Sequence, residues 1–449
     1  MVAQVNRLKA TCVFTIGVLF TLLSFCANAQ TPNILIDDET ETFVCNIVRP
    51  IFKVAGIRFD KNKVHLLSDS SLNAFVSDGN HLFVHTGTLM AAKNPNEISG
   101  ILAHETGHIA GGHILRQKLK IQNLQTLAAV SLVAAGAFGV ASGRGDAALA
   151  VALGSQGSLL NSLIAYQLGE ERSADESAVK YLKALGQSPE GLRNFMKTIQ
   201  KTNRLSGYEE VDYFRTHPMS AERLSFFQNS IQKNGGSTKS AYDEDFLFVQ
   251  AKLTAFLLPI DRVLKKYPAT DKSAPAKYAH SIVKFRQKKF NEAVLLVDEL
   301  IAQFPKNPYF LQLKGQFLFE SGKIEPALES YQKALALKPD SAETTILYAT
   351  AAFESKNKAH LLQDVINRLV KLQNEHERAA VWQLLSRAYF EKGQLAESFD
   401  ALARYNFAIG NIELAQRQVK KALESNPSAS LKLRLSDLER QIKLEKEQN

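Results

Sequence analysis

The sequence predicts a mostly α-helical protein with two domains: an α+β domain of helices around a small β-sheet, then an all-α domain of helical repeats. Three observations carry this prediction. Short β-rich segments lie between residues 64 and 85, a buried helical pattern containing the motif H-E-x-x-H follows them, and helical segments recur at a spacing of 34 residues after residue 276. A chain of 449 residues is long enough for two or three separate hydrophobic cores.

The first 29 residues have the pattern of a cleavable signal peptide. Arg7 and Lys9 precede an apolar run from residue 13 to residue 25, and Ala27-Asn28-Ala29 is a small-residue cleavage site. A transmembrane anchor is the alternative, but this apolar run is short for a membrane span. The formal net charge of +9 is spread along the chain without a basic block, so nucleic-acid binding is not predicted.

The first elements of the exported chain are a helix and a small sheet. Residues 37–56 predict a helix that begins with acidic residues and is kinked or stopped at Pro50. Residues 64–67, 73–76 and 81–85 predict strands, the last two joined by a turn at Asp78-Gly79-Asn80. A sheet of this kind beside a metal-binding helix usually lends an edge strand to an extended substrate, and we expect its three histidines to be ordinary strand residues.

The next predicted helix opens at Asn96 or Glu97 and carries H-E-x-x-H. Because positions i and i+4 share a helix face, His104 and His108 can offer their imidazoles to one metal ion. Glu105 is the next residue round the helix and, in such motifs, accepts the proton of the water on the metal. The alternative is a histidine-bearing surface helix, but the motif arises by chance in only about one per cent of such chains. The sequence therefore predicts one Zn²⁺ per chain.

Residues 124–165 are rich in Ala, Gly, Leu and Val and are interrupted at residues 142–146. This composition predicts a helical hairpin, whose first arm is too short and too rich in glycine for a membrane span. The favoured interpretation is a buried hairpin, or a lid over the cleft. The alternative is peripheral contact of the hairpin with a membrane or a partner.

The motif still lacks a third metal ligand, and Glu171 is the best candidate. Glu171 and Asp175 share a helix face at i and i+4, after a hairpin that can return the chain to the first helix. Asp175 is then expected to hold the N–H of a zinc-bound histidine. The rival ligand, His113, is one residue out of phase with the metzincin pattern, in which position 114 is histidine and Ile114 stands here.

Two further candidates lie downstream. Pro218 favours an extended residue before it, which puts His217 on a loop edge, and Arg223 falls in the first turns of the next helix. Either side chain can face the metal: His217 as a group near the zinc, and Arg223 as a stabiliser of the oxyanion. A capping loop with a surface salt bridge is the alternative, and the residues alone do not separate the two.

The remainder of the chain predicts tetratricopeptide repeats. Ala293 and Pro305 recur as Ala327 and Pro339, which is the 34-residue tetratricopeptide period. Stacked helix pairs of this kind form a concave surface that binds peptides or partner proteins. We therefore expect a signal peptide at 1–29, a first domain at 30–235, a linker and helical bridge at 236–275, and a repeat domain at 276–449.

Taken together, these residues resemble the HtpX and CAAX prenyl protease family of zinc metallopeptidases, and within it the periplasmic BepA-like branch. The resemblance covers nearly all of the exported chain, as a zincin-type metalloprotease domain followed by tetratricopeptide repeats. It rests on His104-Glu105-Thr106-Gly107-His108, Asn73-Ala74-Phe75, Glu171-Arg172-Ser173-Ala174-Asp175, and Thr216-His217-Pro218 with Arg223. The one departure, Thr86-Gly87-Thr88 for the family's Thr-Gly-Leu, affects packing near the cleft and not the chemistry.

The resemblance implies roles for these residues. His104, His108 and Glu171 are the implied zinc ligands, and Glu105 is the implied general base. His217 matches a loop histidine that can occupy the open position of the zinc and hold the enzyme latent. Arg223 matches an arginine held near the reacting carbonyl.

The resemblance also implies a place and a task. Such proteins act in the periplasm of Gram-negative bacteria, where they degrade misfolded or stalled outer-membrane β-barrel proteins and help others to mature. Their repeats contact the β-barrel assembly machinery or the client. We therefore expect an exported zinc endopeptidase. One alternative is a chaperone or scaffold of outer-membrane protein assembly whose metal site is latent, and another is a membrane-bound protease anchored by residues 124–165.

Overall fold

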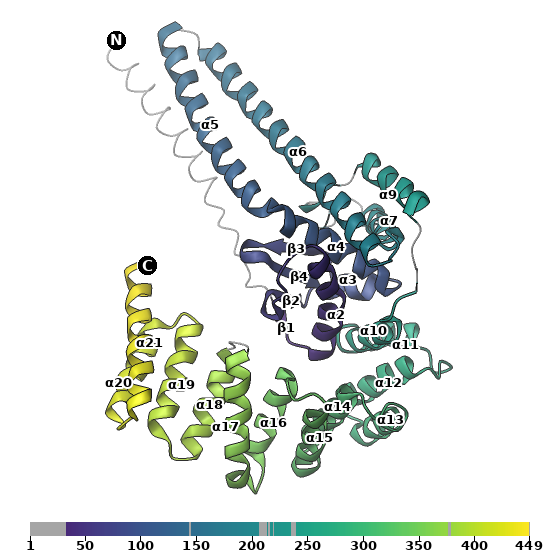
Figure 1. The fold of residues 1–449 in the computed structure, drawn as a ribbon, viewed down its shortest axis with the longest axis vertical. Helices are drawn as coiled ribbons and strands as arrows, with labels where there is room; N and C mark the ends of the chain where they lie inside the picture. Colours follow the sequence, from purple (N-terminus) through teal and green to yellow (C-terminus); the bar gives the residue numbers. More distant parts are fainter. Residues whose placement is uncertain are drawn as a thin grey trace, which may run out of the picture.

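The computed structural model describes residues 33–142, 145–205, 213, 216–218, 220–234, 239–375 and 379–448. The predicted signal peptide therefore lies outside the described residues. Figure 1 shows an α+β body, a long helical hairpin that projects from it, and a curved row of helices on its other side. The predicted fold class, mostly α-helical with one small sheet and an all-α repeat region, is confirmed.

The α+β body begins with a four-stranded sheet and a buried helix. The strands are β1 (Ile34–Leu35), β2 (Val64–Leu67), β3 (Ala74–Ser77) and β4 (His81–His85), in the spatial order β1-β2-β4-β3. β2 pairs with β4 in parallel, and the other two pairs are antiparallel. The turn at residues 78–80 joins β3 to β4, with Gly79 at φ +75°. The segment at β1 was not predicted, because two residues carry no readable alternation.

Helix α2 (Asp38–Val54) packs on this sheet and runs through Pro50 instead of stopping there. Asp37 caps it by accepting hydrogen bonds from the backbone N–H groups of Glu39 and Thr40. After the short α3 (Thr86–Ala91), the motif-bearing helix α4 (Pro95–Gly111) begins at an Asn94 cap and is buried over almost its whole length. It ends at Gly112, whose φ of +63° lies in the left-handed region that favours glycine.

The projecting hairpin consists of α5 (His113–Ser142) and α6 (Gly145–Ala184). Beyond their bases, the two helices contact mainly each other, and Figure 1 shows them leaving the body together. For the side chains that are described at the two ends of residues 124–165, the prediction of a buried hairpin is wrong: Leu127 is 51% exposed, Val130 59% and Ile164 43%. None of the helices in the described part of the chain is long and apolar enough to cross a membrane.

Helices α7 (Glu190–Leu205) and α9 (Ala221–Asn234) complete the body, and α10 (Asp243–Leu257) and α11 (Ile260–Lys266) lead to the repeats. α10 takes part in two cores at once. Phe246 and Leu253 pack in the core of the α+β body, whereas Phe248 and Ala255 pack in the core of the first repeats. Within the stretch expected to be a linker and bridge, α10 therefore contributes side chains to both cores.

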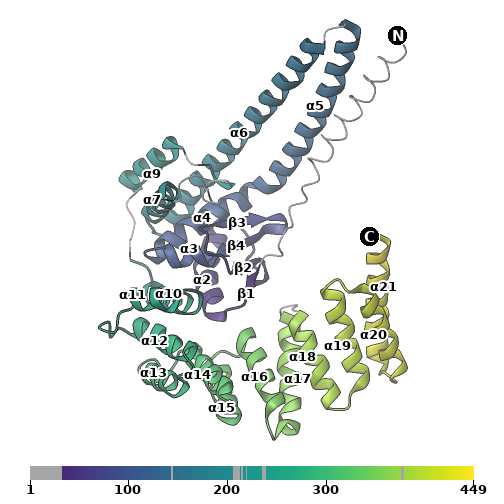
Figure 2. The same ribbon diagram turned by 180° about the vertical axis from the view of Figure 1, so that it is seen from behind.

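The repeat region is a row of helix pairs that forms an arc, as Figure 2 shows from behind. Successive helices contact each other along the row. The helices are α12 (Ala274–Arg286), α13 (Phe290–Gln303), α14 (Pro308–Glu320), α15 (Ile324–Leu337), α16 (Ala342–Glu354), α17 (Lys358–Glu375), α18 (Ala379–Glu391), α19 (Leu395–Ala408), α20 (Ile412–Glu424) and α21 (Ala429–Gln448).

A buried polar interface joins the acidic start of α2 to the repeats. Lys252 Nζ lies 3.0 Å from Asp37 Oδ1 and 3.4 Å from Glu39 Oε2. The backbone N–H of Glu343, in α16, donates to Asp38 at 3.0 Å, and the N–H of Asp38 donates back to the Glu343 carboxylate at 3.0 Å. The start of α2 is therefore held by residues more than 200 positions away.

Candidate metal centre

Four buried side chains converge beside α4: His104, His108, Glu171 and His217. One ligand atom from each lies within 4.8 Å of the others. The Nε2 atoms of His104 and His108 are 3.1 Å apart. Glu171 places Oε2 3.3 Å from His104 Nε2 and Oε1 3.2 Å from His108 Nε2. The residues that the sequence singled out as metal ligands are thus brought together by the fold.

The close approach of α4 to α6 produces this convergence. His104 and His108 lie one turn apart on α4, and Glu171 lies on α6. Gly107 of α4 faces α6, and a Cβ atom at this position would come within 2.8 Å of the Ala174 carbonyl oxygen. A side chain at position 107 would push the helices apart. Glycine therefore sets the separation at which the Glu171 carboxylate reaches both imidazoles.

His217 reaches the same point from the segment before α9. Its Nδ1 lies 3.0 Å from Glu171 Oε1, and its Nε2 lies 3.4 Å from Glu105 Oε1. The backbone N–H of His217 donates to the Tyr213 carbonyl at 2.7 Å, and the Tyr213 ring lies against the imidazole with centroids 4.6 Å apart. Tyr213 was not singled out from the sequence. The only signal for it is its position four residues before His217.

Asp175 and Arg223 form a buried ion pair behind the cluster. Asp175 Oδ1 lies 2.9 Å from His104 Nδ1, and both Asp175 oxygens accept from the Arg223 guanidinium, at 2.6 and 2.9 Å. The guanidinium also contacts Glu171 Oε2 at 2.9 Å and donates to the Pro218 carbonyl oxygen at 2.9 Å. Arg223 thus faces two carboxylates and a backbone carbonyl, which leaves little of it free for a substrate oxygen.

His113 contacts the cluster from outside. Its Nδ1 lies 2.8 Å from Nδ1 of His108, the nitrogen that faces away from the other ligand atoms. Its Nε2 lies 3.0 Å from Glu170 Oε2. His113 is therefore a neighbour of His108, and it is not among the four converging side chains.

The buried titratable side chains of the site shift the pKa values of one another. Burial alone would lower the pKa of His104, but the contacts with Asp175 and Glu171 raise it to about 10. Burial lowers the pKa of His108 to about 3, and the neighbouring His104 and His217 add to this effect. Burial would raise the pKa of Glu171, but the charge of His217 and the histidine hydrogen bonds hold it well below its usual range. Burial raises the pKa of Glu105.

These residues fit a bound metal ion. The carboxylate of Glu105 is fully buried, and its Oε2 has neither a hydrogen bond nor an ion pair among the described residues. Burying such a group unsatisfied is costly, whereas a cation beside it would compensate. Two imidazoles, one carboxylate and one further nitrogen or oxygen are a donor set that suits tetrahedral Zn²⁺.

A cavity of about 260 Å³ opens at the cluster. Its walls include Glu105, His108 and His217, together with Phe75 and Val76 of β3. β3 is an edge strand of the sheet: β4 pairs with one side of it, and no strand of the described sheet pairs with the other. The site therefore lies beside a strand edge, where an extended chain can hydrogen-bond.

Comparisons with known proteins agree with this arrangement. Residues 39–231 match the model of Peptidase family M48, and residues 286–360 match that of Anaphase-promoting complex, cyclosome, subunit 3. The chain is 24% identical over 392 residues to the beta-barrel assembly-enhancing protease of Yersinia pestis, covering 84% of this chain and 78% of that one. It is 22% identical over 374 residues to the protein of that name from Escherichia coli (strain K12), covering 79% and 74%.

A shorter match is the metalloprotease LoiP of Escherichia coli (strain K12), which is 30% identical over 175 residues, 38% of this chain and 63% of LoiP. The long matches run through both the α+β body and the repeats. The chain thus has a metalloprotease domain, residues 39–231 of which match the Peptidase family M48 model, followed by tetratricopeptide-type repeats, and it is similar over most of its length to the beta-barrel assembly-enhancing proteases.

Proposed function

We propose that this protein is a zinc-dependent endopeptidase that cleaves misfolded or stalled outer-membrane β-barrel proteins in the periplasm of a Gram-negative bacterium. The observation that carries the proposal is the buried convergence of His104, His108 and Glu171 next to an acidic residue, Glu105, and an open cavity. The name and the length of the matching relatives support the class of client. The expected signal peptide supports export.

His104, His108 and Glu171 would hold the zinc, with His217 as a fourth ligand at rest. When bound, zinc polarises a carbonyl group and lowers the pKa of water towards neutrality. Glu105 accepts a proton and later passes it to the leaving amine. Burial raises the pKa of Glu105, which brings this carboxyl closer to the range in which it can exchange a proton near neutral pH.

We propose that His217 makes the resting site latent. The imidazole stands between Glu105 and Glu171, at 3.4 and 3.0 Å, which is where a substrate would have to enter. Movement of His217 would open the site. Asp175 orients His104 directly, and Arg223 holds the charges of Asp175 and Glu171. For Arg223 to stabilise an oxyanion as well, its guanidinium would have to release one of these acceptors.

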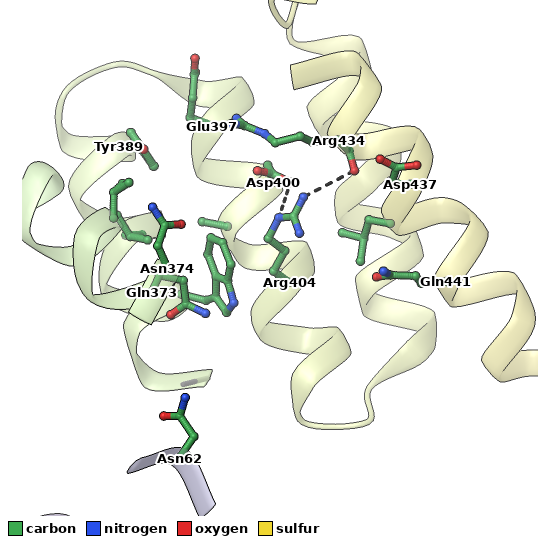
Figure 3. Close-up of a pocket in the computed structure, with 15 residues that line it drawn as sticks. Asn62, Gln373, Asn374, Tyr389, Glu397, Asp400, Arg404, Arg434, Asp437 and Gln441 are labelled. Atoms are coloured by element: carbon green, nitrogen blue, oxygen red, sulfur yellow. Dashed lines mark hydrogen bonds and ion pairs between the residues drawn. The ribbon is translucent and has the colours of Figure 1, made fainter. Parts of the chain in front are cut away.

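The repeats are proposed to bind a polypeptide, either the client or a component of the β-barrel assembly machinery. A cavity of about 670 Å³ lies among α17, α18, α19 and α21, as Figure 3 shows. Arg404 lies over the Trp382 ring at 5.2 Å and pairs with Asp400 at 3.0 Å. Amide side chains that can hydrogen-bond a peptide backbone also line it, namely Asn62, Gln373, Asn374 and Gln441. The cavity thus offers both stacking and backbone recognition.

Two alternatives remain distinct from this proposal. A scaffold of outer-membrane protein assembly with a permanently latent metal site is favoured by the position of His217. A membrane-attached protease is favoured by the exposed leucines and valine of the hairpin. Washing membranes at high pH with carbonate tests the second alternative, because release of the exported protein into the soluble fraction would exclude firm attachment.

The deciding experiment compares wild type, Glu105→Gln and His217→Ala for zinc content and for cleavage of casein. We expect about one zinc per chain in all three. Cleavage should be lost in Glu105→Gln and raised in His217→Ala. If wild type and His217→Ala hold zinc but cleave nothing, that result supports the scaffold alternative. If no form holds zinc, the metal centre itself is wrongly assigned.

A further inference from the structure

His113 is the first residue of α5, yet its side chain turns back towards α4. The chain reverses at Gly112, and a Cβ atom at Gly111 would lie 2.1 Å from His113 Nε2, so glycine at 111 leaves the room that this ring occupies. The imidazole is only 2% exposed and stands almost perpendicular to that of His108, with centroids 4.8 Å apart. The two glycines thus seat one buried histidine against another.

The contacts of His113 belong to a continuous series of polar contacts from His108 to Arg116. Nδ1 of His113 lies 2.8 Å from Nδ1 of His108, and Nε2 lies 3.0 Å from Glu170 Oε2. Glu170 in turn binds the Arg116 guanidinium through both carboxylate oxygens, at 3.2 and 2.9 Å. His113 and Arg116 lie on α5 and Glu170 lies on α6, so the base of the hairpin supplies every residue of this series except His108, which lies on α4.

The proton positions along this series follow from the chemistry of imidazole. A neutral imidazole has one nitrogen that donates and one that accepts. If Nε2 of His108 binds a metal ion, its hydrogen must be on Nδ1, which then donates to Nδ1 of His113. His113 carries its own hydrogen on Nε2, which faces the Glu170 carboxylate. In this arrangement each ring has one hydrogen, no two donors face each other, and Nε2 of His113 lies at ion-pair distance from the carboxylate.

We propose that His113 is a positioning residue of the metal centre, which connects the Glu170 carboxylate to His108 and fixes the tautomer and orientation of that ligand. This inference rests on the proposed zinc site. His104 receives the same support directly, because Asp175 Oδ1 lies 2.9 Å from its Nδ1. Each histidine of the motif is therefore oriented by a carboxylate: His104 by direct contact with Asp175, and His108 by Glu170 acting through the imidazole of His113. Such outer partners typically change metal affinity by about 10- to 100-fold.

Three variants of the full exported chain test this proposal. His113→Phe keeps a ring in the space but has no nitrogen. His113→Asn restores an acceptor oxygen near the place of Nδ1. Glu170→Gln removes the charge at the outer end without disturbing the buried ring. His280→Phe is the matched control, since it makes the same substitution at a half-buried histidine of α12 that contacts the Tyr267 carbonyl.

The readout is zinc affinity, measured by competition with a chromogenic chelator, together with the melting temperature of the metal-free protein. We expect His113→Phe to bind zinc about 10- to 100-fold more weakly, with most of the affinity restored in His113→Asn. Glu170→Gln should also bind more weakly, and His280→Phe should bind as wild type does. Wild-type affinity in His113→Phe, or equal losses in the Phe and Asn variants, would overturn the proposal.

Two further outcomes are separable. If His113→Phe does not fold, Glu170→Gln decides, because unchanged zinc affinity in that variant would disprove the connection through His113. If the wild type itself binds no zinc, the proposed function fails before His113 is tested.

Discussion

Asp175 contacts two other polar side chains of the metal centre, His104 and Arg223. It accepts from His104 on one side and from the Arg223 guanidinium on the other, and all three side chains are buried. Burial would raise the pKa of Asp175, but the hydrogen bonds of His104 and Arg223 lower it, so the carboxylate stays charged. Arg223 therefore has two compensating carboxylates, and Asp175 is the main one, because it accepts two hydrogen bonds from the guanidinium whereas Glu171 makes one contact with it.

Replacing Asp175 by alanine should destabilise the protein by about 3–5 kcal/mol, because the change leaves a buried guanidinium without its main partner. Glu176→Ala is the matched control. Glu176 follows Asp175 on α6 but is exposed, and its ion pair with Arg172 lies at the surface, so the expected cost is at most about 1 kcal/mol. The measurement is denaturant unfolding of the metal-free protein, and similar costs for the two variants would contradict this account.

Gly107 controls the distance between α4 and α6. A Cβ atom at position 107 would overlap the Ala174 carbonyl, so Gly107→Ala should cost about 1–3 kcal/mol and weaken zinc binding. Gly169→Ala is the control, since nothing lies within 4 Å of a Cβ atom there and alanine favours helix. Thermal unfolding should show a lower melting temperature for Gly107→Ala and an equal or higher one for Gly169→Ala. The reverse order would exclude this role for Gly107.

At the scale of elements, helices and strands could be predicted from local periodicity, but contacts between distant parts of the chain could not. The helix carrying His104 and His108 and the strands from residue 64 to residue 85 follow from alternation and helical spacing. Strand β1 could not be predicted, because it exists only through pairing with β2. The position of His113 against His108 depends on a left-handed glycine and on Glu170, more than 50 residues away. The H-E-x-x-H motif indicates neither the backbone conformation of that glycine nor the contact with Glu170.

The hairpin shows the same limit. An alanine- and glycine-rich composition predicts that two helices pack closely, but it does not tell whether a third element covers them. α5 and α6 contact each other, the second half of α6 also packs on α4, and Lys120 lies over the Tyr166 ring at 5.9 Å. The outer part of the hairpin is therefore a unit that the α+β body does not need for its own packing.

Replacing residues 129–157 by a short Gly-Ser turn should accordingly leave the metal centre intact. The shortened hairpin keeps His113, Arg116, Glu170 and the ion pairs between them. We expect zinc affinity within about threefold of wild type, because the contacts that orient the ligands remain. Chelator competition measures this affinity. A loss of about tenfold or more would show that the outer hairpin contributes to the metal centre.

At the scale of the whole molecule, the repeats and the α+β body share a buried acidic interface. The 34-residue period predicted the repeats, but it could not predict that Asp38 would exchange hydrogen bonds with Glu343, 305 positions later. The ammonium group of Lys252 lies near Asp37, Glu39 and Glu343. Burial would lower the pKa of Lys252, but the charges of Asp37, Tyr278, Glu343 and Glu39 raise it well above its usual value. The interface is therefore rich in negative charge.

This excess of carboxylates should make the contact between body and repeats sensitive to pH. Burial raises the pKa of Glu343 to about 7, with Lys252 opposing the shift and Asp37 and Asp38 adding to it. The folded protein therefore binds a proton at Glu343 that the unfolded chain releases near its ordinary pKa of 4.5. Between these two values, the free energy of unfolding should fall as the pH rises, by at most about 1.4 kcal/mol per pH unit from this group.

Glu343→Gln should remove that part of the pH dependence, because glutamine keeps an acceptor for the Asp38 N–H but does not titrate. Denaturant unfolding at several pH values between 5 and 8 should give a flatter curve for Glu343→Gln than for wild type, with the largest gain in stability above about pH 7. Glu320→Gln, on the exposed end of α14, should follow the wild-type curve. Parallel curves for wild type and Glu343→Gln would mean that the interface does not hold a proton, and that Lys252 alone compensates its carboxylates.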